Sequence, residues 1–431
     1  MKYKQFIYNI ILVLGFLIAL PFYLFKMWKR GKYKDGFSQR FGYYPDEIKS
    51  FCQQNPVIWV HAVSVGEVMA TLKLLQSLRS RFPEVHLMLT TTTSRGYQVA
   101  LNKVPEGVKV GYYPLDFLPC VRRALDTLKP AYIILMEGEI WPNMVWEATR
   151  RGIPCALANA DLSPRSEKRY ASGGFFFRDV FSRFNKVFTQ TIEDEQRYRA
   201  VGVSPESAVT VGSLKFDASI PEKEQNKDIG LILEEAGAGT KPIWIAASTH
   251  PGEEEIVLDV FIRLKSGVPN LFLILAPRHD ERTAEVEGVL KRKGLKWIRR
   301  TDCGVKNAQD DCEVLLINTT GELKLFFPKS TVIFIGNSLV GRKGGHNIIE
   351  AAITGKPVVF GKNMQDWQQI ADAFIKAGAG VQVEDGEELF TEVKRLILSS
   401  ADRETIATHA AELIQNNLGA SMRTAKLIEL R

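Results

Sequence analysis

The chain has 431 residues, of which 45% are hydrophobic and 24% charged, and its formal net charge at pH 7 is +7. This composition excludes a largely disordered chain, and the length exceeds what one hydrophobic core usually serves, so we expect two domains. The positive charge favours anionic partners such as phosphorylated lipid, an anionic membrane surface or a nucleotide, although the same residues could simply solvate a membrane-proximal face. Nucleic acid is not expected as a partner, because the sequence has no basic stripe with interleaved aromatic residues.

Residues 1–35 predict a membrane anchor with a basic flank. The segment Phe6–Phe25 carries no charged residue, and twenty helical residues rise about 30 Å, enough to cross a bilayer. More positive charge follows this segment than precedes it, which places the rest of the chain in the cytoplasm. The residues after it are Lys26, Lys29, Arg30, Lys32, Lys34 and, further on, Arg40. A cleaved signal peptide is a competing interpretation, but no cleavage site of small residues follows the apolar segment. An interfacial helix is a weaker alternative, because apolar residues surround the helix and leave no polar face.

The five cysteines are odd in number and show no paired CxxC spacing, which argues against a disulfide framework or a zinc site and fits a reducing compartment.

Short apolar runs alternate with longer helical patterns through the rest of the chain, and this alternation is typical of βαβ units with parallel sheets. The strands expected in the first half are Val57–Val60, Val85–Thr90, Val108–Tyr113, Tyr132–Met136, Pro154–Ala158, Val187–Thr189 and Ala208–Val211. Those expected in the second half are Pro242–Ala246, Leu271–Leu275, Val314–Ile317, Val332–Ile335 and Pro357–Phe360. A polar segment at 215–227 separates the two sets. We therefore expect an α/β chain with Rossmann-like domains at 36–217 and 218–400, and helices at 401–431 that return to the first domain.

The loop His61–Glu67 places a carboxylate at the carboxyl end of the first predicted strand, where ligands bind in open α/β sheets. Glu67 also opens a helix, so a capping role and a catalytic role are both open. In the second half, Arg278 follows a strand and could grip phosphate oxygens, although a lone arginine is more often a surface residue. A glycine-rich loop then runs from Phe334 to Glu350, and such loops let backbone N–H groups approach a phosphate. Within it, His346 could instead be a buried histidine.

Six motifs in this order resemble the bacterial 3-deoxy-D-manno-octulosonate (Kdo) transferases that act on the lipid A precursor. They are His61–Glu67, Met136–Asn143, Asn159–Ser166, Gly212–Asp217, Ala276–His279 and Gly344–Glu350. The resemblance runs over nearly the whole chain. It implies a membrane-anchored glycosyltransferase of the GT-B type, with two Rossmann-like domains facing a cleft, that uses CMP-Kdo and needs no metal or other cofactor. It also implies the bacterial inner membrane as the location, with a single-pass N-terminal anchor and cytoplasmic catalytic domains.

The resemblance also implies residue roles. Glu67 matches the general base, and Glu137 and Lys215 match residues that stabilise the transition state; Glu139 is as open to a capping role as to a catalytic one. The residues that match the CMP-binding positions are Pro277, Arg278, Gly321, Glu322, Leu323, Asn347, Ile348, Ile349 and Glu350. Four positions depart from the family pattern: Asp161 stands for arginine, Ser213 for asparagine, Asn337 for glycine and Ala352 for proline.

The chemistry of these residues agrees with inverting transfer of Kdo from CMP-Kdo to the lipid A precursor. The phosphate leaves with growing negative charge, which calls for cations such as Lys215 and Arg278. On the opposite side a carboxylate must take the proton of the attacking hydroxyl, and Glu67 is our candidate. Two alternatives remain at this stage: a transferase that uses a UDP-sugar and a membrane lipid, and a catalytically silent membrane scaffold. The number of Kdo residues transferred has no signature in the sequence.

Overall fold

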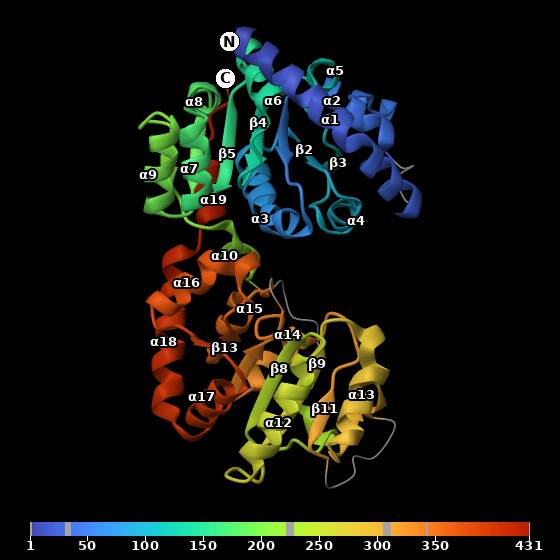
Figure 1. Ribbon diagram of the computed structural model, residues 1–431, viewed down its shortest axis with the longest axis vertical. Helices are drawn as coiled ribbons and strands as arrows, with labels where there is room; N and C mark the ends of the chain where they lie inside the picture. The colour runs from blue at the N-terminus through green and yellow to red at the C-terminus, as the bar shows by residue number, and fades with distance from the viewer. Residues whose placement is uncertain (1, 31–35, 221–227, 305–311, 342–343, 431) are drawn as a thin grey trace. The chain divides into compact units, whose positions relative to one another are not determined.

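A computed structural model describes residues 2–30, 36–220, 228–304, 312–341 and 344–430, and within the helix over 2–30 it describes the side chains of residues 3–22. Lys32 and Lys34 of the predicted basic flank and residues 221–227 of the predicted domain break lie outside the described residues, as do Arg342 and Lys343 of the glycine-rich loop. Residue contacts divide the chain into two compact units (Figure 1). Unit 1 comprises Met1–Ala218 and Asn417–Arg431, and unit 2 comprises Ser219–Asn416.

Unit 1 is built on a sheet whose described strands are all paired in parallel, in the order β3-β2-β1-β4-β5-β6-β7. The strands are β1 (Val57–His61), β2 (His86–Thr91), β3 (Val108–Tyr112), β4 (Pro130–Met136), β5 (Cys155–Ala160), β6 (Lys186–Thr189) and β7 (Ala208–Thr210). Successive residues alternate between two hydrophobic cores. Trp59 and Ile133 belong to one core, whereas Ile58 and Ile134 belong to the other. Burial on both faces explains why these strands are continuous apolar runs in the sequence.

The helices of unit 1 connect these strands and cover both faces of the sheet. They are α1 (Lys2–Arg30), α2 (Asp46–Gln54), α3 (Val65–Arg81), α4 (Ser94–Lys103), α5 (Leu118–Leu128), α6 (Pro142–Arg150), α7 (Pro164–Ser172), α8 (Gly174–Phe181), α9 (Ile192–Val201), α10 (Leu214–Ala218) and α19 (Ala420–Lys426). The last of these comes from the far end of the chain and packs against α3 and α10. Ala420, Ala425 and Ile428 thereby enter the same core as β1 and β4.

Unit 2 has a second parallel sheet, in the order β10-β11-β9-β8-β12-β13-β14. Its strands are β8 (Ile243–Thr249), β9 (Phe272–Pro277), β10 (Trp297–Arg299), β11 (Val314–Leu316), β12 (Val332–Ile335), β13 (Val358–Gly361) and β14 (Val381–Val383). The strands β10 and β14 were not predicted from the sequence. Both are three-residue strands at the edges of the sheet, and edge positions that are half exposed do not require an apolar run.

The helices of unit 2 are α11 (Ile229–Glu235), α12 (Glu253–Lys265), α13 (Thr283–Arg292), α14 (Leu323–Phe326), α15 (Ile349–Ala352), α16 (Gln368–Lys376), α17 (Gly386–Leu398) and α18 (Ser400–Asn417). We expected residues 401–431 to return to the first domain. By residue contacts only the part from Asn417 onward belongs to unit 1, because Ile406 of α18 packs into the core of unit 2. The domain limits expected from the sequence stay a prediction. The expected α/β class with two parallel sheets is confirmed.

Each sheet contains a point at which the strand order reverses direction. In unit 1 this point lies between β1 and β4, since the chain proceeds from β1 to β2 on one side and continues with β4 on the other. In unit 2 it lies between β8 and β12, with β9 on the far side of β8. Ligands of open α/β sheets bind outside the carboxyl ends of the strands at such points. The residues that follow β1, β4, β8, β9 and β12 are therefore the first place to search for a site.

Candidate functional site

Glu67 lies in the first turn of α3, directly after β1, and forms a capping box with Ser64. The backbone N–H of Glu67 donates to Ser64 Oγ at 3.3 Å, and Glu67 Oε1 accepts from the backbone N–H of Ser64 at 3.2 Å. The other carboxylate oxygen, Oε2, accepts from the backbone N–H of Val63 at 2.8 Å. The capping interpretation is therefore confirmed. Both oxygens are occupied by backbone donors, which holds the carboxylate in one orientation at the strand end.

The electrostatic environment of Glu67 is unusual for a helix cap. Its side chain is 8% exposed, and burial raises its pKa to about 7, helped by the neighbouring charges of Glu137 and Glu139 and opposed by the hydrogen bonds from Val63 and Ser64. A carboxyl group with a pKa near 7 is suited to take a proton at neutral pH. Capping and proton transfer are therefore compatible in this position.

Glu137 follows β4, the strand that lies next to β1 in the sheet. Its side chain forms an ion pair with Lys215. Lys215 Nζ lies 3.4 Å from Glu137 Oε1, and Asn159 Nδ2 donates to the same oxygen at 3.2 Å. Both Glu137 and Asn159 have φ of 53°, a left-handed conformation that costs a residue with a side chain on the order of 1 kcal/mol. Asn159 is fully buried, and its Oδ1 accepts from the backbone N–H of Leu214 at 2.9 Å. It thus joins the end of β5 to the turn that carries Lys215.

The C-terminal helix fixes the turn of Lys215 from the other side. Asp217 of α10 is buried, and its two carboxylate oxygens accept from the backbone N–H groups of Gly419 and Ser421, each at 2.7 Å. Because Asp217 sits two residues after Lys215, the start of α19 positions the lysine. The motif Gly212–Asp217 predicted the lysine, but the sequence contained no signal for its connection to residues 419–421.

Two further acids surround the Glu137–Lys215 pair. Burial raises the pKa of Asp161 to about 6, with a further contribution from Glu137 that Lys215 opposes. Burial and Glu137 also raise the pKa of Glu139. The carboxyl edge of the first sheet thus gathers Glu67, Glu137, Glu139 and Asp161, with Lys215 paired to Glu137.

In unit 2, three predicted donor-binding segments are linked to one another at the carboxyl edge. Arg278 follows β9 and is exposed. Two residues later, Asp280 Oδ2 accepts from Thr320 Oγ1 at 3.3 Å, which ties this loop to the turn of Gly321, Glu322 and Leu323. That turn is tied in its own right to the start of α15, because Lys324 Nζ lies 2.7 Å from Glu350 Oε1.

Several of these predicted residues have structural partners that define how they could serve a ligand. Glu322 is 8% exposed and pairs with Arg300 at 3.0 Å. Asn347 Oδ1 accepts from the backbone N–H of Ile349, the first residue of α15, at 3.0 Å, and its Nδ2 donates to Ser219 Oγ. The side chains of Ile348 and Ile349 are fully buried. Neither of these side chains is therefore exposed to a ligand.

The expectation for the glycine-rich loop is wrong in one part. We expected its backbone N–H groups to be available for a phosphate, but those of Asn337, Ser338 and Leu339 all donate to Glu253, at 2.6, 2.9 and 2.9 Å. Glu253 begins α12, is completely buried and also accepts from the backbone N–H of His250 at 3.0 Å. A buried carboxylate thus occupies the position that an anion would need and fixes the loop instead. From the sequence alone, a glutamate at the start of a helix would be interpreted only as a helix cap.

A group of histidines at the same edge was not predicted as a set. His250 follows β8, His279 follows Arg278, and His346 lies in the glycine-rich loop. His250 Nε2 lies 3.2 Å from His346 Nε2, and the rings of His250 and His279 are 5.9 Å apart. Burial lowers the pKa of His346 to about 4, assisted by the positive charge of Arg278, and burial also lowers the pKa of His250. The three strands β9, β8 and β12 bring these residues together.

Three of the four departures from the family pattern are readily accommodated. Asn337 has φ of 57°, and asparagine adopts this left-handed conformation more easily than most residues with a side chain. Ser213 Oγ reaches Asn159 Oδ1 at 3.3 Å. Ala352 supplies a backbone N–H that donates to Ile348 O at 3.1 Å, which proline cannot do. Asp161 is the exception, because it adds negative charge beside Glu137. No cluster of three or more metal-ligating side chains lies among the described residues.

Comparison with known proteins decides the family. Residues 35–218 match the family model described as 3-Deoxy-D-manno-octulosonic-acid transferase (kdotransferase). Over 426 residues the chain is 31% identical to the 3-deoxy-D-manno-octulosonic acid transferase of Haemophilus influenzae, covering 99% of this chain and 98% of that one. The chain belongs to the Kdo transferase family. The relative of the same name in Chlamydophila psittaci is 28% identical over 383 residues, 88% of this chain and 86% of that one. This Kdo transferase family member is thus a glycosyltransferase.

Solved structures support the fold independently. The UDP-GlcNAc 2-epimerase of Neisseria meningitidis bound to UDP-GlcNAc matches with a TM-score of 0.60 at 13% identity, covering 86% of this chain and 98% of that one. A structure described as the glycotransferase of kitacinnamycin matches with a TM-score of 0.55 at 14% identity, covering 87% and 98%. At these identities the likeness concerns the fold alone, and it confirms the GT-B type expected from the sequence.

Proposed function

We propose that this chain transfers Kdo from CMP-Kdo to a hydroxyl of the lipid A precursor, with inversion at the anomeric carbon. The observation that carries the proposal is Glu67: in a member of the Kdo transferase family, a carboxyl group with a pKa of about 7 stands at the switch point of the first sheet, beside the Glu137–Lys215 pair.

Unit 1 would supply the base. The acceptor hydroxyl oxygen forms a bond to the anomeric carbon while the bond from that carbon to the phosphate oxygen of CMP breaks. The hydroxyl proton passes to Glu67, and the electron pair of the broken bond leaves with CMP. Such a reaction needs a carboxylate before the step and tolerates a carboxylic acid after it, which a pKa near the working pH allows.

Lys215 would act on the charge that develops during this step. An ammonium group is worth most in a transition state when it is positioned in advance, so that no reorganisation is required. Glu137 and the capped start of α19 supply that positioning here. Glu137 would thus contribute through Lys215 as well as through its effect on the pKa of Glu67.

Unit 2 would hold the donor. Arg278 is exposed and forms no ion pair among the described residues, so its guanidinium is available to a phosphate. The linked loops would supply the other proposed contacts to CMP, through Pro277, the turn of Gly321, Glu322 and Leu323, and the residues from Asn347 to Glu350. No metal or other cofactor is part of the proposal.

We also propose that α1 attaches the protein to the cytoplasmic face of the bacterial inner membrane, where an acylated acceptor resides. The helix contains the one segment, Tyr3–Phe22, that is long and apolar enough to cross a membrane among the described residues. Basic residues flank the segment in the sequence and suit the anionic lipid surface and the phosphates of the acceptor.

The test is CMP release from CMP-Kdo in the presence of vesicles containing the tetraacylated lipid A precursor, with the product identified by mass spectrometry. We expect CMP release that depends on the acceptor and a mass increase of one or more Kdo residues. Parallel titrations with CMP and UDP address the two alternatives. Tighter binding of UDP than of CMP would indicate that the donor is a UDP-sugar. If neither nucleotide binds and no CMP is released, the chain is a catalytically silent scaffold.

A further inference from the structure

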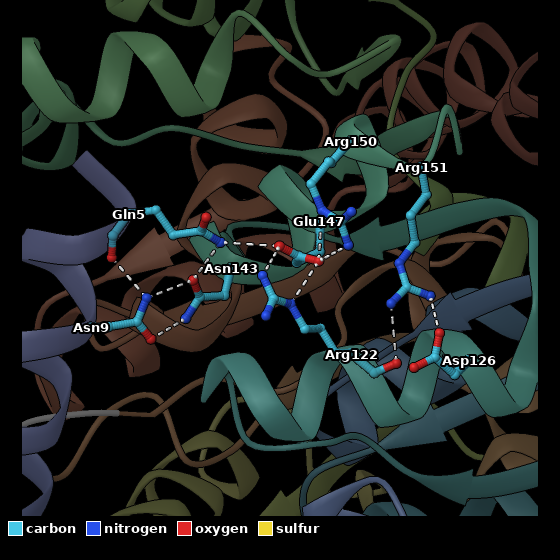
Figure 2. A network of polar contacts seen from close by, with 8 residues as sticks. All are labelled: Gln5, Asn9, Arg122, Asp126, Asn143, Glu147, Arg150 and Arg151. Carbon is cyan, nitrogen blue, oxygen red and sulfur yellow. Dashed lines mark hydrogen bonds and ion pairs between the residues drawn. The ribbon is translucent and has the colours of Figure 1, made fainter. Parts of the chain in front are cut away.

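Three polar side chains in the first half of the N-terminal helix, those of Gln5, Tyr8 and Asn9, lie on one face that packs against the rest of unit 1. Gln5 is 8% exposed, and its Nε2 donates to Asn143 Oδ1 at 3.2 Å and lies 3.5 Å from Glu147 Oε1. Asn9 and Asn143 exchange two amide hydrogen bonds, at 3.1 and 3.0 Å. Figure 2 shows both α1 side chains directed at α6. The polar positions of α1 are therefore those that meet polar partners on the globular unit.

The third polar residue, Tyr8, extends this contact to the loop before α5. Its hydroxyl donates to Asp116 Oδ2 at 2.9 Å, and its ring stacks on Phe176 with centroids 5.6 Å apart. Asp116 is itself buried, and it accepts from the backbone N–H groups of Asn143 and Met144 at the start of α6, both at 3.0 Å. The same carboxylate thus caps α6 and holds α1.

The contact continues along the helix. Near its start, Lys4 Nζ donates to Phe175 O at 2.5 Å, and three turns later Phe16 meets Phe117 edge to face with centroids 5.1 Å apart. Twelve residues of helix rise about 18 Å. Since both ends of this stretch touch unit 1, α1 lies along the surface of the unit rather than pointing away from it, as Figure 1 also shows.

The opposite face of α1 is an exposed apolar stripe. Its members recur at helical spacing: Tyr3, Phe6, Ile10, Ile11, Val13, Leu14, Leu17, Ile18 and Phe22. Ile18 is 82% exposed, and Phe175 on α8, beside Lys4, extends the apolar surface with 70% exposure. A contiguous apolar surface of this length that is exposed to solvent indicates a docking site. The basic residues that flank the segment in the sequence favour an anionic lipid surface as its occupant over a second copy of the chain.

A spanning orientation conflicts with these contacts. The charged surroundings of the polar face, where Arg122 and Arg150 pair with the buried Glu147, cannot follow α1 into the hydrocarbon. If α1 left the rest of unit 1 instead, the amides of Gln5 and Asn9 would enter the hydrocarbon and Asn143 would lose its two partners on α1.

We propose that α1 does not cross the membrane but lies in the plane of its cytoplasmic face, with the apolar stripe among the lipids and the polar face fastened to α6. This proposal rests on the membrane attachment proposed above and not on the chemistry of transfer. It replaces the single-pass anchor expected from the sequence by an interfacial helix, and it places unit 1 directly on the membrane surface.

The first experiment determines the side of the membrane on which residue 1 lies. An epitope tag is added before Met1 of the full-length chain, and external protease is applied to spheroplasts and to inverted membrane vesicles. We expect the tag to survive in spheroplasts and to be cleaved in inverted vesicles. Cleavage in spheroplasts would overturn the proposal, because a spanning helix with its basic flank inside places residue 1 outside.

A matched variant tests whether the polar contacts hold the helix in the plane. Replacing Gln5→Leu, Tyr8→Phe and Asn9→Leu together removes the ties to Asn143 and Asp116 and leaves a uniformly apolar segment. We expect part of this variant to insert across the bilayer, so that external protease now cleaves its tag in spheroplasts. A tag that stays protected in the variant would show that these contacts do not decide the orientation.

Vesicle flotation tests the apolar stripe without any measurement of activity. Purified full-length chain is mixed with vesicles of phosphatidylethanolamine and phosphatidylglycerol, and the wild type is compared with Phe6→Ser combined with Leu14→Ser and Ile18→Ser. We expect at least a tenfold loss of bound protein with an unchanged melting temperature, because all three side chains are more than half exposed. Unchanged flotation, or a loss accompanied by dissociation of a dimer, would overturn the assignment. The protease and flotation measurements do not depend on Kdo transfer, so a failure of the proposed reaction would not change their outcome.

Discussion

The carboxyl edges of the two sheets have the same topological position but carry different ionisable side chains. After β1, β4 and β5 the first sheet presents Glu67, Glu137, Glu139 and Asp161 with one lysine, and burial and mutual repulsion raise the pKa of Glu67 to about 7. After β9, β8 and β12 the second sheet presents Arg278 and three histidines, and burial with positive neighbours lowers the pKa of His346 to about 4. The acidic edge is suited to take up a proton, and the basic edge is suited to bind an anion.

Loop anchoring follows the same division. On the acidic edge Glu67 itself occupies the backbone donors at the helix start and remains near the proposed chemistry. On the basic edge the corresponding anchor is Glu253, which is completely buried and accepts four backbone hydrogen bonds, so the loop is shaped by a residue that no ligand reaches. A carboxylate at a helix start is therefore not by itself evidence of catalysis; its burial and neighbours decide.

The largest effect is expected at Glu67. Glu67→Gln should lower kcat by about two to four orders of magnitude if this carboxyl is the base. Because both oxygens accept backbone hydrogen bonds, the amide would also turn an NH2 group toward an N–H donor, and we expect a loss of stability of about 1–3 kcal/mol. Kinetics and thermal unfolding measure the two effects separately.

Ser64→Ala is the matched control for this experiment. It removes the cap from the same helix and should cost about 1 kcal/mol of stability, but it keeps the carboxylate. Turnover near that of the wild type is expected. If both variants lost turnover in proportion to their stability, Glu67 would be a structural residue only.

A smaller effect is expected on the basic edge. Arg278→Ala should raise the apparent KM for CMP-Kdo about ten- to a hundredfold, since a charge-assisted phosphate contact contributes roughly 1.5–3 kcal/mol. Arg292→Ala is the control, because this arginine of unit 2 forms an exposed ion pair with Glu255. An unchanged KM in the Arg278 variant would remove this residue from the donor site.

The pH dependence of turnover should report the acidic edge. Since the base must be ionised, the rate is expected to fall about tenfold per pH unit below a pKa of about 7. Glu137→Gln removes a charge that raises this pKa, so the limb should move to lower pH, whereas Glu139→Gln should move it less because its contribution is smaller. Identical limbs in all three proteins would contradict the assignment.

Stability should respond to the same group in the opposite sense to activity. The pKa of Glu67 in the folded chain is raised from its usual 4.5 to about 7. Its stabilising contribution is thus complete below about pH 4.5 and is lost as the pH rises through about 7.

The smallest effect concerns protons on the basic edge. An anion bound near Arg278 would offset the positive charge that helps to keep His346 neutral, so CMP binding at pH 6 should take up a fraction of a proton. Calorimetry in buffers of different ionisation enthalpy measures this uptake. His346→Asn should abolish it and His409→Gln, at a half-buried position on α18 beside Gly378, should not. Heats that do not depend on the buffer would contradict the coupling.

The amino-acid sequence was enough to predict the two parallel sheets, because strands buried on both faces must be apolar throughout, and to predict the family, because six motifs recur in order. It also located Glu67 and Arg278, since a residue that ends a strand is adjacent to it in the chain. Contacts between residues far apart in the chain became visible only in the folded protein. Glu253 occupies the loop of residues 337–339, His250 meets His346, and residues 419–421 position Lys215. The sequence likewise does not show whether the polar residues of α1 face lipid or α6. Hydropathy sums the properties of single side chains and contains no information on the residues that they contact.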